Sequence, residues 1–398
     1  AWGDSHTMLN ALYYRLMFGV TISNFFLDNV AADTPEHATM RAEVRFLRAL
    51  YYYYMMDLYG NPPFIDHISS EKPIQYSRAQ IFAWIEGELK AVLGEVAEDN
   101  SDVLADAALS YGRVSKPAAR LLLARLYLNA EVYTGTARWA DAKAYAQAVM
   151  KDSNLSLCTT GKGGYSAYQL LFMGDNDTNG AQKEIILPAI HDGETTQTWG
   201  GCLFIIASTS NDAMVEDYLI GTSEKWGGNV ARKQFVEKFF PNNDAPSGIP
   251  TAVAEAAGDD RALFFTKGHT SSIEDETSFT NSGYGYVKFL GIHSDGSSPK
   301  HTQFVDTDFP MMRLAEAYLT FAEADARLNG NLCTAEGLEA IKAIRSRANA
   351  TTNFSRFSLA QIEDEWSREF GFEGRRRMDL IRFNHFGGQN EYKWEYMG

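Results

Sequence analysis

Apolar residues recur at spacings of three and four in several blocks of the chain, which predicts amphipathic helices. The clearest block begins at Thr34-Pro35, because proline suits a first helical position where no backbone N–H is needed. Gly60 and the prolines after it end this block. The apolar positions along one face of this predicted helix are Val44, Leu47, Tyr51, Met55 and Leu58. The tyrosine run at 51–54 cannot all share that face, so core packing against neighbouring helices is its favoured role.

Two pairs of helices follow, each interrupted by a short break. In the first pair the break is the segment 134–136, which contains a glycine. Both pairs contain the pattern A-x-x-Y-L, in which small alanines allow close helix approach and tyrosine fills the gap, as in tetratricopeptide-type pairs. The predicted helices occupy residues 117–133, 137–150, 309–330 and 335–349.

The segment between the two pairs, about 155–308, has a different texture. It is dense in Gly, Asn, Ser and Thr, and its strand-like runs, such as 184–190 and 284–290, are short. Long loops on a rigid scaffold are where binding sites usually lie. The sequence therefore predicts a mainly α single domain. A tetratricopeptide-like helical-repeat scaffold at about 1–154 and 309–386 carries a large irregular, loop-rich insertion with short strands.

The last helical block begins at Ser358 and is rich in opposite charges. Ser358 and Gln361 have the spacing of a capping box. An active site in the charged run that follows is one alternative. Interleaved opposite charges more often form ion pairs between elements, so a structural clamp is favoured. The charged residues are Arg368, Glu369, Glu373, Arg375, Arg376, Arg377, Asp379 and Arg382.

Composition restricts the partners of the chain. Its net charge of −15 argues against nucleic acid or anionic lipid, since both need a positive face. Three cysteines without C-x-x-C spacing indicate neither a disulfide framework nor a zinc site. No uncharged apolar run reaches the roughly 18 residues that span a bilayer. Neutral ligands remain open.

Motifs for catalysis are absent from the sequence. There is no G-x-S-x-G, no H-E-x-x-H and no glycine-rich loop ending in Lys-Ser or Lys-Thr. The eight histidines do not have a two-ligand helical spacing. A triad assembled in space and a glycosidase carboxylate pair both stay open, because neither needs a local motif.

One loop has the spacing of a cation ligand set. The run DNDTNG at 175–180 resembles the first half of an EF-hand loop, but its twelfth position is Ile186 rather than glutamate. An Asx-rich turn is the favoured interpretation. The alternative is a structural calcium held by Asp175, Asp177 and Glu184; no other cofactor is expected.

Two tryptophans, Trp199 and Trp226, each stand immediately before a pair of glycines within the insertion. In one interpretation each pair makes a tight turn and the indole packs beneath it. In the other, the glycines leave an exposed indole face uncrowded, so that a ligand can stack on it. From composition and spacing alone the two interpretations are about equally supported.

Four long blocks of the sequence resemble the SusD/RagB family of outer-membrane nutrient-binding lipoproteins. They are residues 41–64, 120–135, 309–324 and 365–383, and the segments 172–201 and 225–240 follow the same pattern. The resemblance covers nearly the whole chain in order and is greatest to the family's starch-binding founding member. It implies a tetratricopeptide-like scaffold with a shallow glycan site lined by aromatic rings and no enzymatic activity.

The resemblance also implies roles for the two tryptophans. Trp226 matches a tryptophan of the founding member's aromatic arc, and Trp199 stands where that member has a tyrosine. The rest of the arc would come from a segment before Ala1. We therefore expect both indoles to stack on a starch-type oligosaccharide.

The expected partners follow from the same resemblance. One is a TonB-dependent, SusC-like porin. The other is the outer membrane, which the protein would contact only through a lipid anchor whose cysteine is not in this chain. Three alternatives stay open: a different glycan, a glycoside hydrolase, or a helical-repeat protein whose ligand is another protein.

Overall fold

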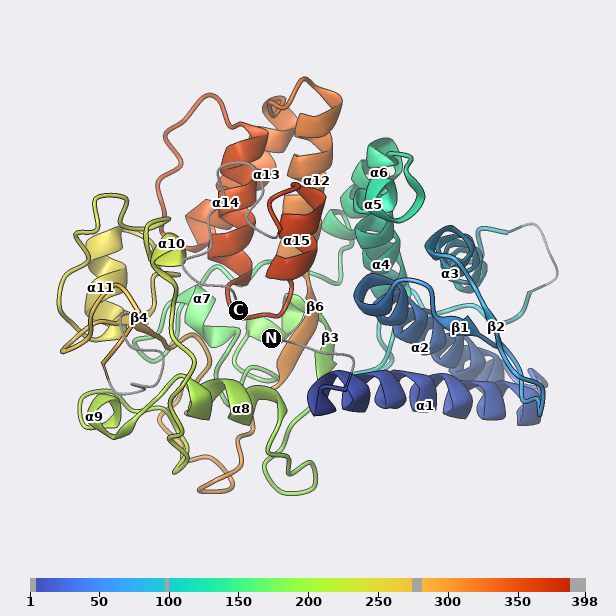
Figure 1. The fold of residues 1–398 in the computed structure, drawn as a ribbon, viewed down its shortest axis with the longest axis horizontal. Coiled ribbons are helices and arrows are strands. Elements are labelled where there is room, and N and C mark those ends of the chain that lie inside the picture. Colours follow the sequence, from blue (N-terminus) through green and yellow to red (C-terminus); the bar gives the residue numbers. More distant parts are fainter. Residues whose placement is uncertain (1–4, 97–99, 274–280, 387–398) are drawn as a thin grey trace. The chain divides into compact units, whose positions relative to one another are not determined.

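The computed structural model describes residues 5–96, 100–273 and 281–386. These residues form fifteen α-helices, one short 3-10 helix and six short strands (Figure 1). The predicted mainly α fold is confirmed. No helix in the described ranges combines the length and apolarity needed to cross a bilayer.

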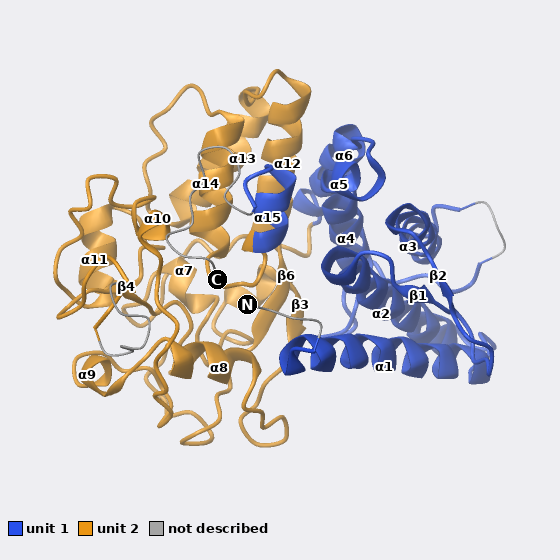
Figure 2. Cartoon of the chain, in the orientation of Figure 1, with its two compact units in different colours: residues 1–152, 377–398 blue, residues 153–376 orange. Residues whose placement is uncertain are grey.

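The chain divides into two compact units. Unit 1 comprises residues 1–152 and 377–398, and unit 2 comprises residues 153–376 (Figure 2). This boundary places the helices between residues 314 and 370 in the same unit as the predicted insertion. The single-domain organisation stays a prediction.

Unit 1 is a stack of helices in which consecutive members pack together. Helix α1 packs on α2, α2 on α3, α3 on α4, and α4 on α6. The predicted break after the α4–α5 segment is confirmed, since α5 ends at a left-handed Gly135. The elements are α1 (Thr7–Asn29), α2 (Pro35–Tyr59), β1 (Pro63–Phe64), β2 (Ile74–Gln75), α3 (Arg78–Leu93), α4 (Lys116–Leu128), α5 (Ala130–Thr134), α6 (Trp139–Met150) and most of α15 (Arg376–Arg382).

The ends of α2 are confirmed, but its buried face differs from the predicted one. Oγ1 of Thr34 accepts the N–H of His37 at 3.1 Å, and Gly60 ends the helix with φ of 84°. Leu58, predicted on the apolar face, is exposed. Because α1 and α3 both pack on α2, burial is spread around the helix rather than confined to one stripe. The buried residues include Ala42, Phe46, Ala49, Tyr53 and Met56.

The tyrosine run belongs to the core of unit 1, as predicted. Tyr52 and Tyr53 are buried. The Tyr52 hydroxyl donates to the carbonyl of Ile65 and accepts its N–H, both at 2.8 Å. The burial of this polar group is thereby compensated.

Unit 2 combines irregular segments with three longer helices. The segment Phe309–Arg313, predicted as the start of a helix, instead forms strand β6, and α12 begins at Leu314. The prediction was wrong because this segment pairs antiparallel with β3, with Ile185 opposite Arg313. The elements are α7 (Ala167–Leu170), η1 (Ala181–Lys183), β3 (Ile185–Ala189), α8 (Gly201–Ser208), α9 (Asp212–Val215), α10 (Lys233–Val236), α11 (Pro250–Ala257), β4 (Phe264–Phe265), β5 (Gly285–Tyr286), β6 (Phe309–Arg313), α12 (Leu314–Leu328), α13 (Ala335–Arg347) and α14 (Leu359–Phe370).

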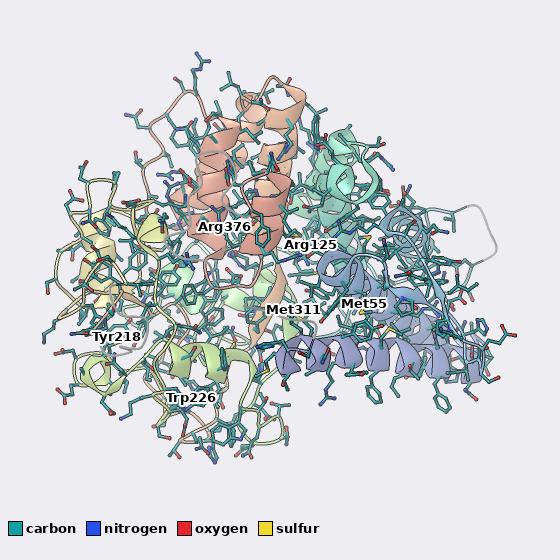
Figure 3. All side chains as sticks on the ribbon, in the orientation of Figure 1. Met55, Arg125, Tyr218, Trp226, Met311 and Arg376 are labelled. Carbon is teal, nitrogen blue, oxygen red and sulfur yellow. The ribbon has the colours of Figure 1, made fainter. Side chains whose placement is uncertain are left out.

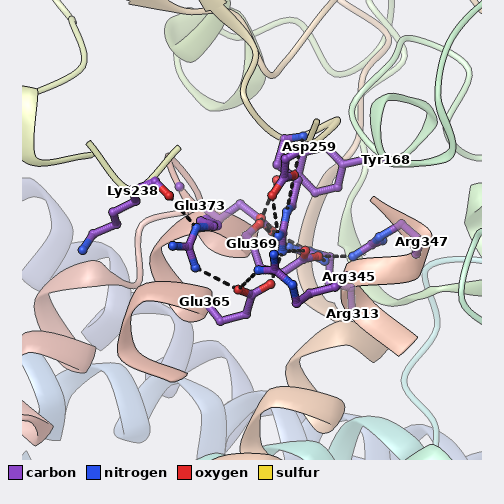
Figure 4. A network of polar contacts seen from close by, with 12 residues as sticks. Tyr168, Lys238, Asp259, Arg313, Arg345, Arg347, Glu365, Glu369 and Glu373 are labelled. Carbon is purple, nitrogen blue, oxygen red and sulfur yellow. Dashed lines mark hydrogen bonds and ion pairs between the residues drawn. The ribbon is translucent and has the colours of Figure 1, made fainter. Parts of the chain in front are cut away.

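The charged run that begins in α14 forms ion pairs between elements, as predicted (Figure 4). Glu369 is fully buried and pairs with Arg313 at 2.6 Å, with Arg261 at 3.2 Å and with Arg347. Burial alone would raise the pKa of Glu369, but the charges of Arg347, Arg313 and Arg261 outweigh it and hold that pKa well below its usual range. This charged cluster of unit 2 consists of Glu184, Arg261, Arg313, Arg347, Glu369 and Glu373.

Candidate functional site

The first Trp-Gly-Gly stretch forms the entry to α8. Trp199 directly precedes Gly200, the N-cap residue of that helix. Gly201 has φ of 59°, and a Cβ at this position would lie 2.5 Å from Nε2 of His191. Only glycine fits both the backbone conformation and the space.

The second stretch closes the other end of the same helix, and Figure 3 shows Trp226 beside α8. The N–H of Trp226 donates to the carbonyl of Ala207 at 2.8 Å, and that of Gly227 to Ser210 at 2.9 Å. Ala207 lies in the last turn of α8, where no further helical N–H groups follow, and Ser210 lies just beyond the end of the helix. Gly227 and Gly228 both have positive φ, 66° and 107°. The two tryptophans are therefore brought together because both glycine turns attach to one short helix.

Five aromatic rings in unit 2 contact one another in sequence beside α8, and we call them the ring row. They are Phe204, Trp226, Trp199, Phe304 and His301. Successive ring centroids are 6.0, 6.1, 5.2 and 5.2 Å apart. Trp199 is 54% exposed and Trp226 is 38% exposed. The indole planes are inclined to each other by 36°. Neither indole is packed beneath its turn, and their role in ligand binding stays a prediction.

A carboxylate fixes the orientation of the Trp226 ring. Nε1 of Trp226 donates to Oε2 of Glu224 at 2.7 Å, and Nε2 of Gln303 donates to Oε1 at 2.7 Å. These hydrogen bonds, from Gln303 and then Trp226, lower the pKa of Glu224. Each carboxylate oxygen retains one further acceptor position, since an ionised carboxylate has about four. The site therefore offers acceptors beside its apolar faces.

Five members of this site were not identified from the sequence: Phe204, Glu224, His301, Gln303 and Phe304. Phe204 belongs to the same segment as Trp199, and its exposure on α8 could only be guessed before the helix was placed. Glu224 is two residues from Trp226 but has no distinguishing motif. Gln303 and Phe304 lie far along the chain, so no spacing signal connects them to either tryptophan.

The three residues predicted to bind calcium do not form one site. Ser294 donates to both carboxylate oxygens of Asp175, through its N–H at 3.0 Å and its hydroxyl at 2.6 Å. Glu184 is buried in the charged cluster, where Arg347 lies 3.0 Å away. Asp177 is exposed. Within the described part of the chain, no group of three His, Cys, Asp or Glu side chains could hold a metal ion. The residues present therefore do not fit the predicted calcium.

We expect a chelator to leave the melting temperature unchanged. A cation bound only to the folded state would stabilise it by mass action, and its removal would lower that temperature. Since Asp175 and Glu184 already have protein partners, removal of calcium should have no effect. Thermal denaturation with excess EDTA, and with calcium-saturated EDTA as the control, checks this. A fall that added calcium reverses would contradict it.

Comparisons with known proteins agree on one family. The SusD family matches residues 215–398. The chain is 37% identical to the starch-binding protein SusD of Bacteroides thetaiotaomicron, in an alignment that covers all of this chain and 74% of SusD. It is 24% identical to a SusD-like protein of Bacteroides ovatus, over 91% of this chain and 63% of that protein. The solved structure of a SusD-like protein from Bacteroides fragilis superposes with a TM-score of 0.70 at 19% sequence identity. The match covers 94% of this chain and 75% of the B. fragilis chain.

Proposed function

The chain belongs to the SusD family, and from this premise we propose that it captures starch-type α-glucan oligosaccharides on the ring row. Family membership confirms the resemblance found in the sequence. SusD family members are non-catalytic carbohydrate-binding proteins, so the chain is not an enzyme.

The observation that carries the proposal is the pair of exposed indoles, with centroids 6.1 Å apart and planes inclined by 36°. A sugar ring has an apolar face of C–H groups and a rim of hydroxyls. The indoles offer surface for that face, and the Glu224 carboxylate beside them offers acceptors for the rim. A relative that is 37% identical is named for starch binding, which supports the choice of glycan.

The inclination of the indoles favours a curved glycan over a flat one. Two inclined platforms support successive sugars that turn relative to each other, as they do in α-1,4-glucan. A flat β-1,4-glucan chain would have to bend to contact both rings. The free energy of that distortion would reduce its affinity.

We therefore expect β-cyclodextrin to bind at least as tightly as maltoheptaose, and cellohexaose not to bind. The cyclic sugar is already curved and loses less conformational freedom on binding. Isothermal titration calorimetry with the three sugars measures this, and a glycan array on the same protein extends the test to other linkages. Equal or tighter binding of cellohexaose would refute the assignment to α-glucan.

The wider role that we propose is delivery of the bound oligosaccharide to a TonB-dependent, SusC-like porin at the outer surface of the outer membrane. A lipid anchor outside this chain would hold the protein there. The support for this step is family membership. Co-purification of such a porin with the tagged full-length protein from its own cells would support it. Its absence at native expression levels would contradict it.

A further inference from the structure

A cavity of about 390 Å³ lies in unit 2 at the His301 end of the ring row. This volume is at the lower end of the range of small-molecule pockets, roughly 300–1,000 Å³, and suits one or two sugar units. Tyr165, Leu219 and Pro299 supply apolar wall, and Leu219 is 69% exposed. Thr222, Ser298, His301 and Thr302 supply polar groups.

The cavity and the ring row share one wall. His301 lines the cavity, and its ring lies against Phe304 with centroids 5.2 Å apart. Phe304 in turn contacts Trp199. His301 lines the cavity, and only the ring of Phe304 separates it from Trp199, on which we expect a sugar to stack.

Hydrogen bonds join the two segments that form this wall. The N–H of Ser223 donates to the carbonyl of Thr302 at 2.8 Å, and the Thr222 hydroxyl donates to the carbonyl of Gln303 at 2.6 Å. The same two segments also contain Glu224 and Gln303, whose side chains are hydrogen-bonded to each other beside the ring row. One pair of cross-linked segments thus serves both the cavity and the aromatic site.

Backbone hydrogen bonds hold the ring of His301, which lines the cavity. Nδ1 of His301 accepts the N–H groups of Gln303 and Phe304, both at 3.1 Å. In the neutral ring this places the proton on Nε2, which can then donate to a ligand.

The lining favours an uncharged ligand. Among the described residues that line the cavity there is no Asp, Glu, Lys or Arg. A charged ligand would lose its hydration without gaining an opposite charge. A hexose unit, with an apolar face and several hydroxyls, matches such a mixed lining.

We propose that the cavity is a subsite for a further sugar of the glycan that lies on the ring row. This inference rests on the proposed function, because the ring row must hold the glycan first. The subsite extends the binding surface beyond the aromatic rings. Oligosaccharides long enough to cross the shared wall gain affinity from it, and short ones do not.

Ser298→Trp tests the subsite by filling the cavity from an exposed position of its lining. We expect roughly 5- to 10-fold weaker binding of maltoheptaose, because the ligand would lose one or two hydrogen bonds and an apolar contact in the cavity. The affinity for maltotriose should be nearly unchanged. Ser355→Trp, at an exposed serine outside both sites, is the matched control. Calorimetry measures the affinities, and circular dichroism verifies that each variant is folded.

Unchanged maltoheptaose affinity in Ser298→Trp, or equal losses for both sugars, would overturn the subsite. Trp226→Ala separates this result from failure of the proposed function. If the unmodified protein binds maltotriose and Trp226→Ala weakens that binding, the ring row is the primary site and only the subsite is rejected. If the unmodified protein binds neither sugar, the proposed function fails, and the subsite with it.

Discussion

Trp226→Ala is expected to weaken oligosaccharide binding by roughly 10- to 50-fold while leaving the melting temperature almost unchanged. Stacking one sugar removes about 80–100 Å² of apolar indole surface from water, which stabilises the complex by about 2–2.5 kcal/mol at most. The ring is 38% exposed, so its removal leaves no core cavity. Titration calorimetry with maltoheptaose measures the affinity of the variant.

Trp199→Ala should have a similar or smaller effect on binding. The Trp199 indole is 54% exposed and so is more exposed than the Trp226 indole. In the described structure no carboxylate accepts a hydrogen bond from the Trp199 indole, whereas Glu224 accepts one from Trp226. The ring is therefore less fixed before the ligand arrives.

A buried tryptophan of unit 2 provides the matched control for both variants. Trp366 is fully buried, and its Nε1 donates to Glu323 at 2.7 Å. Trp366→Phe should lower the melting temperature and leave sugar binding intact. If Trp226→Ala behaved like this control, with reduced stability and unchanged affinity, the ring row would be a structural feature rather than a binding surface.

Glu369→Ala is expected to destabilise unit 2 by roughly 3–5 kcal/mol, the range for removal of one partner from a buried ion pair. The substitution leaves Arg261, Arg313 and Arg347 buried without the carboxylate that they share. Such a loss is a large part of the about 5–15 kcal/mol that stabilises a typical domain.

Chemical denaturation followed by circular dichroism measures this loss. The matched control is Glu339→Ala, which breaks an ion pair with Lys342 at 3.0 Å in which the glutamate side chain is 74% exposed. Exposed pairs contribute little, so this control should unfold almost like the unmodified protein. Glu369→Gln keeps the side-chain volume and removes only the charge, so it shows whether charge or packing is responsible. Equal stability of Glu369→Ala and the unmodified protein would contradict the interpretation of the charged cluster as a clamp.

Local sequence signals predicted most helices and several of their ends. Thr34 and Ser358 cap their helices through hydrogen bonds to residues three positions away, so the signal is complete within one turn. The glycine turns beside Trp199 and Trp226 were likewise readable, because the conformational freedom of glycine is a local property. The structural role of the charged run at 368–382 followed from the alternation of its charges along the chain.

Contacts between residues far apart in the chain depended on the three-dimensional fold. Strand β6 replaced a predicted helical turn because its backbone pairs with β3, a partner far away in the sequence. Glu184, a calcium ligand in the alternative to an Asx-rich turn, pairs instead with arginines from β6 and α13 in the charged cluster. Phe304 likewise contacts Trp199 only because the fold brings together two segments that are far apart in the chain. Periodicity and caps act within a few residues, whereas ion pairs, strand pairing and ring contacts depend on the path of the whole chain, which no local pattern specifies.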